Sequence, residues 1–458
     1  MEVLNFINGE FVKTKSLQMS EKFDPFTGKS MGSAGTSDVM DLVQAIQGAK
    51  AVLADLEKMT YEKRAEKLKI GSEVVFRNAA LWAAEEARFQ GLPQSFVETN
   101  IIIPAAELLK KISNDLLHAT SETRPVGLVA VSVPWGASFL LAIERIAPAL
   151  AAGNAVILHL STDSFCTLKM VSELVKQAEW PKGSLQIILG PRKEIVPLLA
   201  GHPGIAAFSY VGHEKHRDKI IQMASSSGKR IQMSLSAKNS LIFLEEPPSA
   251  EDLLEKLRPC LVGMGQNAWN THRIFILESF RPSFLEKLKL ALSDLKPAVD
   301  QTSPELSLWP LIDPLRIESL QKLRTQIPTD EGKVFWGGES FVQNGGYFVQ
   351  PLFSIDLSNC STWQQEDLRL PYFIVTSVKY SHEIAKWNNT GSFGHSAVIW
   401  GPEDKARSLG QKLQVGQVML NKWKISMAHD FVPQKLSREG IPDYRWDGHF
   451  FTESCSVI

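Results

Sequence analysis

The sequence is poor in cysteine and has no excess of either charge. Its 458 residues include four dispersed cysteines (Cys166, Cys260, Cys360 and Cys455), with no Cys-x-x-Cys pair and no His/Cys spacing that would close a zinc site. Lysine plus arginine number 49 against 50 aspartate plus glutamate, so no whole-protein field attracts nucleic acid or an anionic membrane. These absences argue against polyanionic partners and favour a reducing, cytoplasmic setting.

Long apolar runs are also missing. No segment reaches the uninterrupted apolar length that a bilayer-spanning helix needs. The start, "MEVLNFINGEFV", has an acid at its second position and not the charged leader and apolar core of a signal peptide. The last four residues, "CSVI", have the Cys-a-a-X form of a prenylation signal, but isoleucine is an atypical final residue and no basic run precedes it. Membrane attachment is therefore not expected.

Alternating helical and apolar segments fill most of the chain. From Ser37, "SDVMDLVQAIQGAKAVLADL" carries apolar residues at helical spacing and predicts an amphipathic helix. Then "RPVGLVAVSVPW", "SFLLAIERIAPALAAGN" and "AVILHL" form a strand–helix–strand unit, and the alternation continues to about residue 235. It restarts at "NSLIFLEE" and runs to "GQVMLN". Strands that alternate with crossover helices predict parallel sheets covered by helices on both faces.

The length of the chain predicts more than one packed unit. The alternation suggests a first α/β domain over residues 1–235, a second over 236–428, and a C-terminal return segment with an edge strand over 429–458. No Gly/Ser linker separates the first two units, so a packed hinge is expected between them.

Several short motifs occur in an order shared with one protein family. They are "FINGEFV", "RPVGLVAVSVPW", "IAPALAAGNAVIL", "GKRIQMSLSAKNSLIFLEE", "PLID", "GGYFVQP", "VGQVMLN" and "FFTE". Because these motifs occur in the family's order, the chain resembles the aldehyde dehydrogenase superfamily over nearly its whole length. The resemblance implies an α/β fold with two Rossmann-type domains: a dinucleotide-binding domain and a catalytic-type domain that holds a thiol loop. It also implies a strand arm that bridges subunits.

The resemblance also assigns the catalytic positions, and there the sequence departs from the family. The family's thiol is the second residue after a Gly-Gln pair, a position that Ala268 occupies here. The oxyanion-binding Asn of Pro-Trp-Asn corresponds to Gly136, and the glutamate base corresponds to Ser234. A methyl group is no nucleophile, and a serine hydroxyl is not a useful base near neutral pH. Loss of one oxyanion donor typically lowers the rate by roughly 10²–10³.

The cofactor contacts implied by the resemblance are altered as well. The Lys and Glu that hold the adenosine ribose correspond to His159 and Thr162. The small-residue turn under the dinucleotide reads "SYVGHE", with one residue inserted and with Tyr210 or Val211 where the smallest side chain is expected. Trp135 is retained, and Asp367 replaces the nicotinamide-ribose glutamate with a carboxylate that is one methylene shorter. No cofactor is therefore expected, and NAD(P) is the candidate if these four vestigial contacts still form a site.

Other groups offer weak substitutes for the missing chemistry. Cys260 precedes the vacant thiol position by eight residues, on an apolar stretch typical of a buried cysteine. Ser234 and Lys238 are four residues apart, and nothing in the sequence shows that they meet. His213 and His216 lie in "GHEKHRDK", which is typical of a solvated helix face, so no metal is expected.

The leading interpretation is an aldehyde-dehydrogenase-like protein that is not catalytic and binds a protein partner or a small ligand. The alternative is an NAD(P)-dependent aldehyde oxidoreductase with relocated groups, favoured by the retained Trp135, Gln266, Arg273 and Asp367. Between the helix that ends near Leu117 and the next strand, only "HATSETRP" remains, which is too short for a two-stranded arm. A shortened oligomerisation arm is predicted, which leaves the family's oligomer in doubt.

Overall fold

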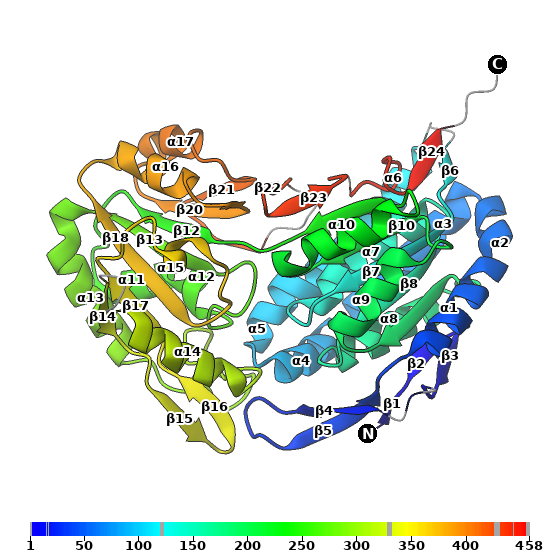
Figure 1. Ribbon diagram of the computed structural model, residues 1–458, viewed down its shortest axis with the longest axis horizontal. Coiled ribbons are helices and arrows are strands. Elements are labelled where there is room, and N and C mark those ends of the chain that lie inside the picture. The colour runs from blue at the N-terminus through cyan, green and yellow to red at the C-terminus, as the bar shows by residue number, and fades with distance from the viewer. Residues whose placement is uncertain are drawn as a thin grey trace.

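A computed structural model describes the chain except for residues 1, 15, 17, 120–122, 328–331, 426–430, 443 and 455–458. The "CSVI" motif lies outside these described residues. The molecule has two lobes, each built around one large sheet, and the C-terminal segment crosses from the second lobe back to the first (Figure 1). Within the described ranges, no helix combines the length and the apolar character that crossing a membrane requires.

The first lobe contains an eight-stranded sheet in the order β23-β11-β10-β7-β8-β9-β2-β3. Its strands are β2 (Asn5–Ile7), β3 (Glu10–Val12), β7 (Leu128–Val133), β8 (Ala155–Leu160), β9 (Leu185–Leu189), β10 (Ala207–Val211), β11 (Arg230–Ser234) and β23 (Arg438–Gly440). Its helices are α1 (Val39–Ala51), α2 (Leu53–Lys58), α3 (Tyr61–Arg77), α4 (Ala79–Gln90), α5 (Gln94–Val97), α6 (Ile103–Leu117), α7 (Ser138–Ala151), α8 (Phe165–Gln177), α9 (Arg192–Gly201) and α10 (Arg217–Ser225).

The second lobe contains a seven-stranded sheet in the order β14-β17-β18-β13-β12-β20-β21. Its strands are β12 (Asn239–Phe243), β13 (Thr271–Leu277), β14 (Lys333–Trp336), β17 (Leu352–Ile355), β18 (Tyr372–Val378), β20 (Ser396–Trp400) and β21 (Gln417–Leu420). Its helices are α11 (Ala250–Lys256), α12 (Arg258–Leu261), α13 (Arg281–Ser293), α14 (Leu315–Gln326), α15 (Thr362–Gln365), α16 (Ser381–Asn389) and α17 (Glu403–Gly410).

Four small sheets complete the described elements. They pair β1 (Glu2–Val3) and β4 (Met19–Phe23) with β5 (Ser30–Gly35), β15 (Ser340–Gln343) with β16 (Gly346–Val349), β19 (Phe393–Gly394) with β22 (Gln434–Lys435), and β6 (Thr123–Pro125) with β24 (Thr452–Ser454). The last pair occupies the predicted arm region. Strands β6 and β24 have three residues each and pair with each other. That the oligomerisation arm is shortened stays a prediction.

The prediction of an α/β fold with helix-covered parallel sheets is confirmed for the sheet centres. Strands β7 to β11 run parallel, and so do β12, β13, β17, β18, β20 and β21. Along β12, Leu241 and Phe243 belong to one apolar cluster while Ile242 belongs to another, so both faces are buried.

Three of the four sheet edges are antiparallel, which the alternation pattern did not predict, whereas the edge strand β21 is parallel to β20. Strands β2, β3, β14 and β23 run antiparallel to a neighbour. They are three or four residues long, so they leave no alternating signature in the sequence. The first large sheet uses strands from residues 5–234 plus β23, and the second uses residues 239–420. Domain boundaries at 235 and 428 stay predictions.

Candidate functional site

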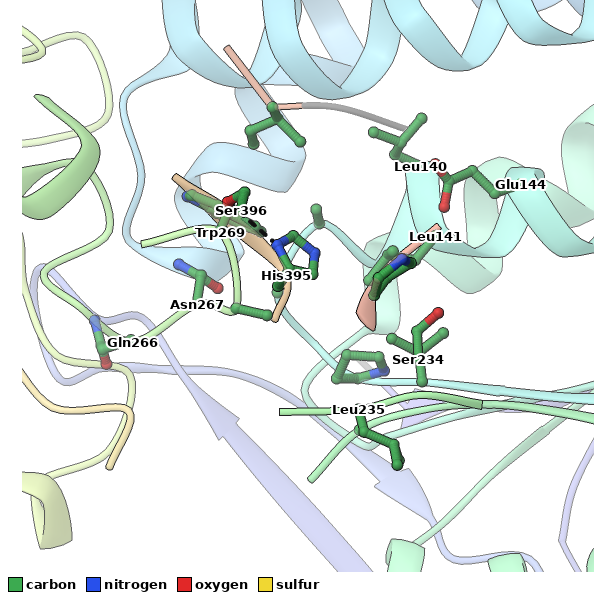
Figure 2. Close-up of a pocket in the computed structure, with 18 of the residues that line it drawn as sticks. Leu140, Leu141, Glu144, Ser234, Leu235, Gln266, Asn267, Trp269, His395 and Ser396 are labelled. Carbon is green, nitrogen blue, oxygen red and sulfur yellow. Dashed lines mark hydrogen bonds between the residues drawn. The ribbon is translucent and has the colours of Figure 1, made fainter. Parts of the chain in front are cut away.

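A cavity of about 130 Å³ lies between the two lobes (Figure 2). Residues that follow or end β7, β10 and β11 form one wall, and α7 forms another. The opposite side consists of residues 266–269, His395 and Ser396, and the C-terminal segment closes it near residues 423–425 and 431–433. The carboxyl ends of parallel strands are the usual place for ligand sites in α/β proteins, so this cavity is the candidate site.

Ala268 lies in this cavity wall on a tightly held loop. Three successive residues before it, Gly263 to Gly265, have positive φ angles of 79°, 51° and 66°, which turn the chain sharply. The Asn270 side chain donates to the Val262 carbonyl oxygen at 2.7 Å and accepts from the Asn267 backbone N–H at 3.0 Å. The Asn239 side chain donates to the Ala268 carbonyl oxygen at 2.8 Å. Side-chain hydrogen bonds of Asn239 and Asn270 therefore hold the loop in place, and the loop carries the methyl group of Ala268 in the cavity wall.

The side chain of Asn267 fills the space beside Gly136. A Cβ atom built on Gly136 would collide with Asn267 Oδ1, so no side chain fits there in this arrangement. Asn267 is buried, and its Nδ2 has no hydrogen-bond partner among the described residues. An amide thus lies next to the position where the resemblance places the oxyanion donor, although it comes from the thiol loop. The sequence analysis missed Asn267, since a single amide in a loop carries no pattern.

Ser234 belongs to a buried polar network. Its hydroxyl is 2.8 Å from the Tyr444 hydroxyl and accepts from Arg145 Nη2 at 3.0 Å. Arg145 forms an ion pair with Glu144 at 2.6 Å, and its guanidinium lies 4.7 Å from the centre of the Tyr444 ring. Figure 2 shows Glu144 and Ser234 on the side of the cavity opposite Asn267 and Trp269. The charged pair within the apolar helix "SFLLAIERIAPALA" was the signal in the sequence that could have revealed this network.

The residues of the first lobe that the resemblance assigns to the adenosine ribose have few polar groups available to bind a ligand. Both ring nitrogens of His159 are bonded internally, Nδ1 to Ser132 Oγ at 2.9 Å and Nε2 to the Gly190 carbonyl oxygen at 3.0 Å. Burial lowers the pKa of His159 to about 3, so the ring is neutral. Thr162 lies half-buried in the turn after β8.

Tyr210 and Arg192 occupy the approach to Gly212 in the "SYVGHE" turn. A Cβ atom on Gly212 would collide with the Tyr210 hydroxyl and with Arg192 Nη2. The Arg192 guanidinium lies 4.7 Å from the centre of the Tyr210 ring. The Tyr210 ring and the Arg192 guanidinium therefore occupy volume beside the turn where the resemblance places a dinucleotide. That no cofactor binds there stays a prediction.

Trp135 and Asp367 lie on the nicotinamide side implied by the resemblance. Trp135 lines the cavity, and the guanidinium of Arg316 lies 5.9 Å from the centre of its ring. Asp367 is buried and accepts from Arg369 Nε at 2.9 Å. Burial alone would raise the pKa of Asp367, but Arg369, with smaller effects of His272 and His213, lowers it to about 2.

Comparison with known proteins shows which family the chain belongs to. The model of the aldehyde dehydrogenase family matches residues 11–457. The chain belongs to the aldehyde dehydrogenase family. It is 25% identical over 475 residues to the 2-aminomuconic semialdehyde dehydrogenase of Bos taurus and 26% identical over 481 residues to that of Homo sapiens, which covers 99% of this chain and 97% of each relative.

Solved structures of the family share the fold. An aldehyde dehydrogenase from Bacillus cereus superimposes with a TM-score of 0.90 at 21% identity, covering 99% of this chain and 95% of that one. A cysteine-to-alanine variant of the P. syringae indole-3-acetaldehyde dehydrogenase, in complex with NAD+ and IAA, gives a TM-score of 0.89 at 21% identity, covering 98% and 95%. The predicted aldehyde dehydrogenase fold is confirmed, while the roles of Ala268, Gly136 and Ser234 stay predictions.

In this aldehyde dehydrogenase family member, no described cysteine offers a reactive thiol in the cavity wall. Cys260 packs in the core of the second lobe, where its Sγ is 3.1 Å from Thr271 Oγ1. Burial raises the pKa of its thiol to about 12, so it is protonated at neutral pH. Cys166 donates to Glu86 at 2.7 Å inside the first lobe, and Cys360 is exposed.

The remaining residues that the sequence suggested as substitutes do not form a catalytic group with one another. Ser234 bonds to Tyr444 and Arg145, whereas the buried Nζ of Lys238 has no hydrogen-bond partner in the described part of the chain. His213 and His216 are both half-buried, whereas their sequence pattern is typical of a solvated helix face. The Nδ1 atom of His213 lies 2.8 Å from Glu214, and with Asp367 these residues bring possible ligand atoms within 4.8 Å of one another. That no metal binds there stays a prediction.

Proposed function

We propose that this member of the aldehyde dehydrogenase family does not oxidise aldehydes through a thiol, and that its cleft binds a small ligand or a partner. The observation that carries the proposal is Ala268, a methyl group on a loop whose frame of asparagine hydrogen bonds is intact. Covalent capture of an aldehyde carbonyl needs a nucleophile that carbon–hydrogen bonds cannot supply.

Two further positions support the same conclusion. At Gly136 there is no side-chain donor, and Asn267 occupies the adjoining volume. At Ser234 a hydroxyl bonded to Arg145 and Tyr444 stands where the family has a carboxylate base. Loss of a base typically lowers the rate by roughly 10²–10⁴, and loss of an oxyanion donor by roughly 10²–10³, so restoring the thiol alone is not enough.

A turnover assay tests the proposal. Purified protein is mixed with NAD+ or NADP+ and a panel of aliphatic, aromatic and carboxylate-bearing aldehydes, and formation of NAD(P)H is followed. We expect no formation above a heat-treated sample, with an active aldehyde dehydrogenase as the positive control. The Ala268→Cys variant should remain at least roughly a thousandfold below that control, because it still lacks base and oxyanion donor. Stoichiometric turnover by the unaltered protein would overturn the proposal.

A second candidate function is NAD(P)-dependent aldehyde oxidation with relocated groups. The relatives that match over 99% of this chain carry the name of an aldehyde dehydrogenase, which supports this candidate more than the first. The amide of Asn267 next to Gly136 is a group in the cavity wall that could replace a lost oxyanion donor.

Calorimetric titration with NAD+ separates the two candidates. The filled approach to Gly212 and the internally bonded His159 lead us to expect no binding in the micromolar range. Tight binding together with NADH formation would establish the second candidate. Tight binding without turnover would identify a nucleotide-binding protein that is not an enzyme, which is compatible with the first.

A further inference from the structure

The wall of the central cavity carries more positive than negative charge. Its charged side chains are Arg145, Arg316, Arg369 and Lys424 on one hand and Glu144 on the other. Arg145 is neutralised by Glu144 at 2.6 Å. Arg369 is neutralised by Asp367, which lies just behind the wall, at 2.9 Å. Lys424 is exposed to solvent, where its charge is screened. Arg316, which is half-buried and also borders an open surface hollow beside Ser319 and Lys322, is left as the cation of the wall without an ion pair among the described residues.

Arg316 is held in place by contacts that do not neutralise it. It comes from the first turn of α14, and its Nη1 donates to the carbonyl oxygen of Arg369 at 2.5 Å. Its guanidinium lies 5.9 Å from the centre of the Trp135 ring, which is a cation–π contact. Among the described residues, no carboxylate oxygen lies within 4.0 Å of it. Nearby negative charges are otherwise engaged, since Asp163 pairs with Lys22 and Asp313 accepts from the backbone N–H of Leu315.

The surroundings of Arg316 disfavour its positively charged form. Burial lowers the pKa of its guanidinium and the neighbouring charge of Arg369 lowers it further, against smaller raising effects of the carboxylates of Asp313, Asp163 and Asp367. A guanidinium in such a position gains most from an anion that offers two oxygen atoms, because its fork of N–H groups matches a carboxylate. This environment favours an anionic ligand over a neutral one.

The rest of the cavity limits the size and character of that ligand. Its wall is largely apolar, with Leu140, Leu141, Trp269, Met419 and Trp423 among the lining side chains. A dry engineered cavity of about 150 Å³ accepts a benzene molecule. At about 130 Å³, this cavity has room for a body of similar or slightly smaller size, and a whole dinucleotide is far too large for it.

We propose that the cavity binds a small carboxylate, with the carboxylate group against Arg316 beside Trp135 and an apolar body of about six carbons among Leu140, Leu141 and Trp269. The proposal rests on the proposed non-catalytic function and names the ligand class for that cleft. In this role Arg316 recognises charge, and the apolar wall selects the shape of the body.

Binding of matched neutral and charged probes tests the proposal. The full-length protein is titrated with benzoate, phenylacetate and hexanoate, and in parallel with benzamide, a neutral molecule of the same shape as benzoate. Quenching of tryptophan fluorescence reports occupancy, because Trp135, Trp269 and Trp423 line the cavity. We expect at least one of the carboxylates to bind in the millimolar range or tighter, and benzamide at least roughly tenfold more weakly than benzoate.

Three variants separate charge recognition from a general effect on folding. Arg316→Gln should weaken carboxylate binding roughly tenfold or more, and Arg316→Lys, which keeps the charge, should retain part of the affinity. Arg324→Gln removes a half-buried arginine from the same helix α14 that does not line the cavity, and it should bind as the unaltered protein does. Melting temperatures measured alongside show whether each variant is folded.

The proposal is overturned if no carboxylate of the panel binds, if benzamide binds as tightly as benzoate, or if folded Arg316→Gln binds unchanged. These titrations contain neither NAD(P) nor aldehyde, so they test carboxylate binding separately from the proposed lack of catalysis. If the protein binds benzoate and also oxidises aldehydes, only the proposed lack of catalysis is overturned.

Discussion

Gly136 and Asn267 share one volume in the cavity wall, and this contact leads to a first prediction. A Cβ atom at residue 136 would collide with Asn267 Oδ1, so Gly136→Ala should lower the free energy of unfolding by about 1–3 kcal/mol. Because Asn267 Nδ2 has no partner among the described residues, Asn267→Ala should cost less, and the double variant should regain most of the loss. Denaturant unfolding of the three variants checks this. Additive losses in the double variant would show that the two side chains do not compete.

For single residues, the sequence predicted which side chains occupy the family's catalytic positions, but it did not predict which side chains contact them in the folded chain. Counting from the Gly-Gln pair placed Ala268 on the loop, and the structure puts that residue in the cavity wall. The same counting could not reveal Asn267, Tyr444 or Arg316, because each matters through a contact with a residue far away in the sequence. His159, predicted as a vestigial cofactor contact, is a buried strand residue whose two ring nitrogens are both hydrogen-bonded within the protein.

Three elements meet at Ser234, and their junction leads to a second prediction. Ser234 ends β11, Arg145 belongs to α7, and Tyr444 comes from the C-terminal segment that crosses between the lobes. Tyr444→Phe removes one buried hydrogen bond but keeps the ring over Arg145, so it should cost about 1 kcal/mol of unfolding free energy. Tyr444→Ala also removes the ring and should cost clearly more. Equal losses in the two variants, measured by denaturant unfolding, would mean that the ring contributes nothing.

The elements themselves divide into those with a sequence signature and those without one. Helix α1 begins as predicted after Asp38, whose side chain accepts from the backbone N–H groups of Met40 and Asp41. Central strands such as β7 and β8 are continuous apolar runs that are fully buried, which is why they were predictable. Strands β2, β3 and β14 were missed, because short antiparallel pairs need neither an apolar run nor a crossover helix. Strand β23 lies within residues 429–458, where an edge strand was predicted.

At the scale of the whole molecule, Lys238 lies in the connection between the two large sheets and leads to a third prediction. Burial lowers its pKa from 10.5 to about 7. Below pH 7 the folded and unfolded chains both hold this proton, and the buried charge destabilises the fold by a constant amount. Between pH 7 and 10.5 the unfolded chain binds more protons than the folded chain, so the free energy of unfolding rises with pH.

A neutral side chain at this position removes that dependence. From pH 7 to about pH 9, the unaltered protein should gain about 2 kcal/mol of unfolding free energy relative to Lys238→Met, which keeps the apolar stem. Lys405→Met, at an exposed position on α17, serves as the control and should follow the unaltered protein. Parallel pH profiles for the unaltered protein and Lys238→Met, measured by urea unfolding, would show that Lys238 is not a buried amine of lowered pKa.

The two-lobed arrangement follows from the sequence more securely than the function of the cleft between the lobes. Alternation and shared motifs predicted the fold, and the family comparison over residues 11–457 agrees with it. The cavity depends on residues from α7, the loop around Ala268, α14 and the C-terminal segment, which meet only in the folded chain.

The most direct test of the central claim is peptide mapping after reaction with an acyl donor. The full-length protein is incubated with 4-nitrophenyl acetate, digested, and analysed by mass spectrometry, with an active aldehyde dehydrogenase treated in the same way. We expect acyl groups only on exposed side chains such as Cys360 or Lys424, and none on a buried residue that lines the cavity. Stoichiometric acylation of a buried side chain in the cavity wall would reveal a working nucleophile and contradict the proposed lack of thiol-type catalysis.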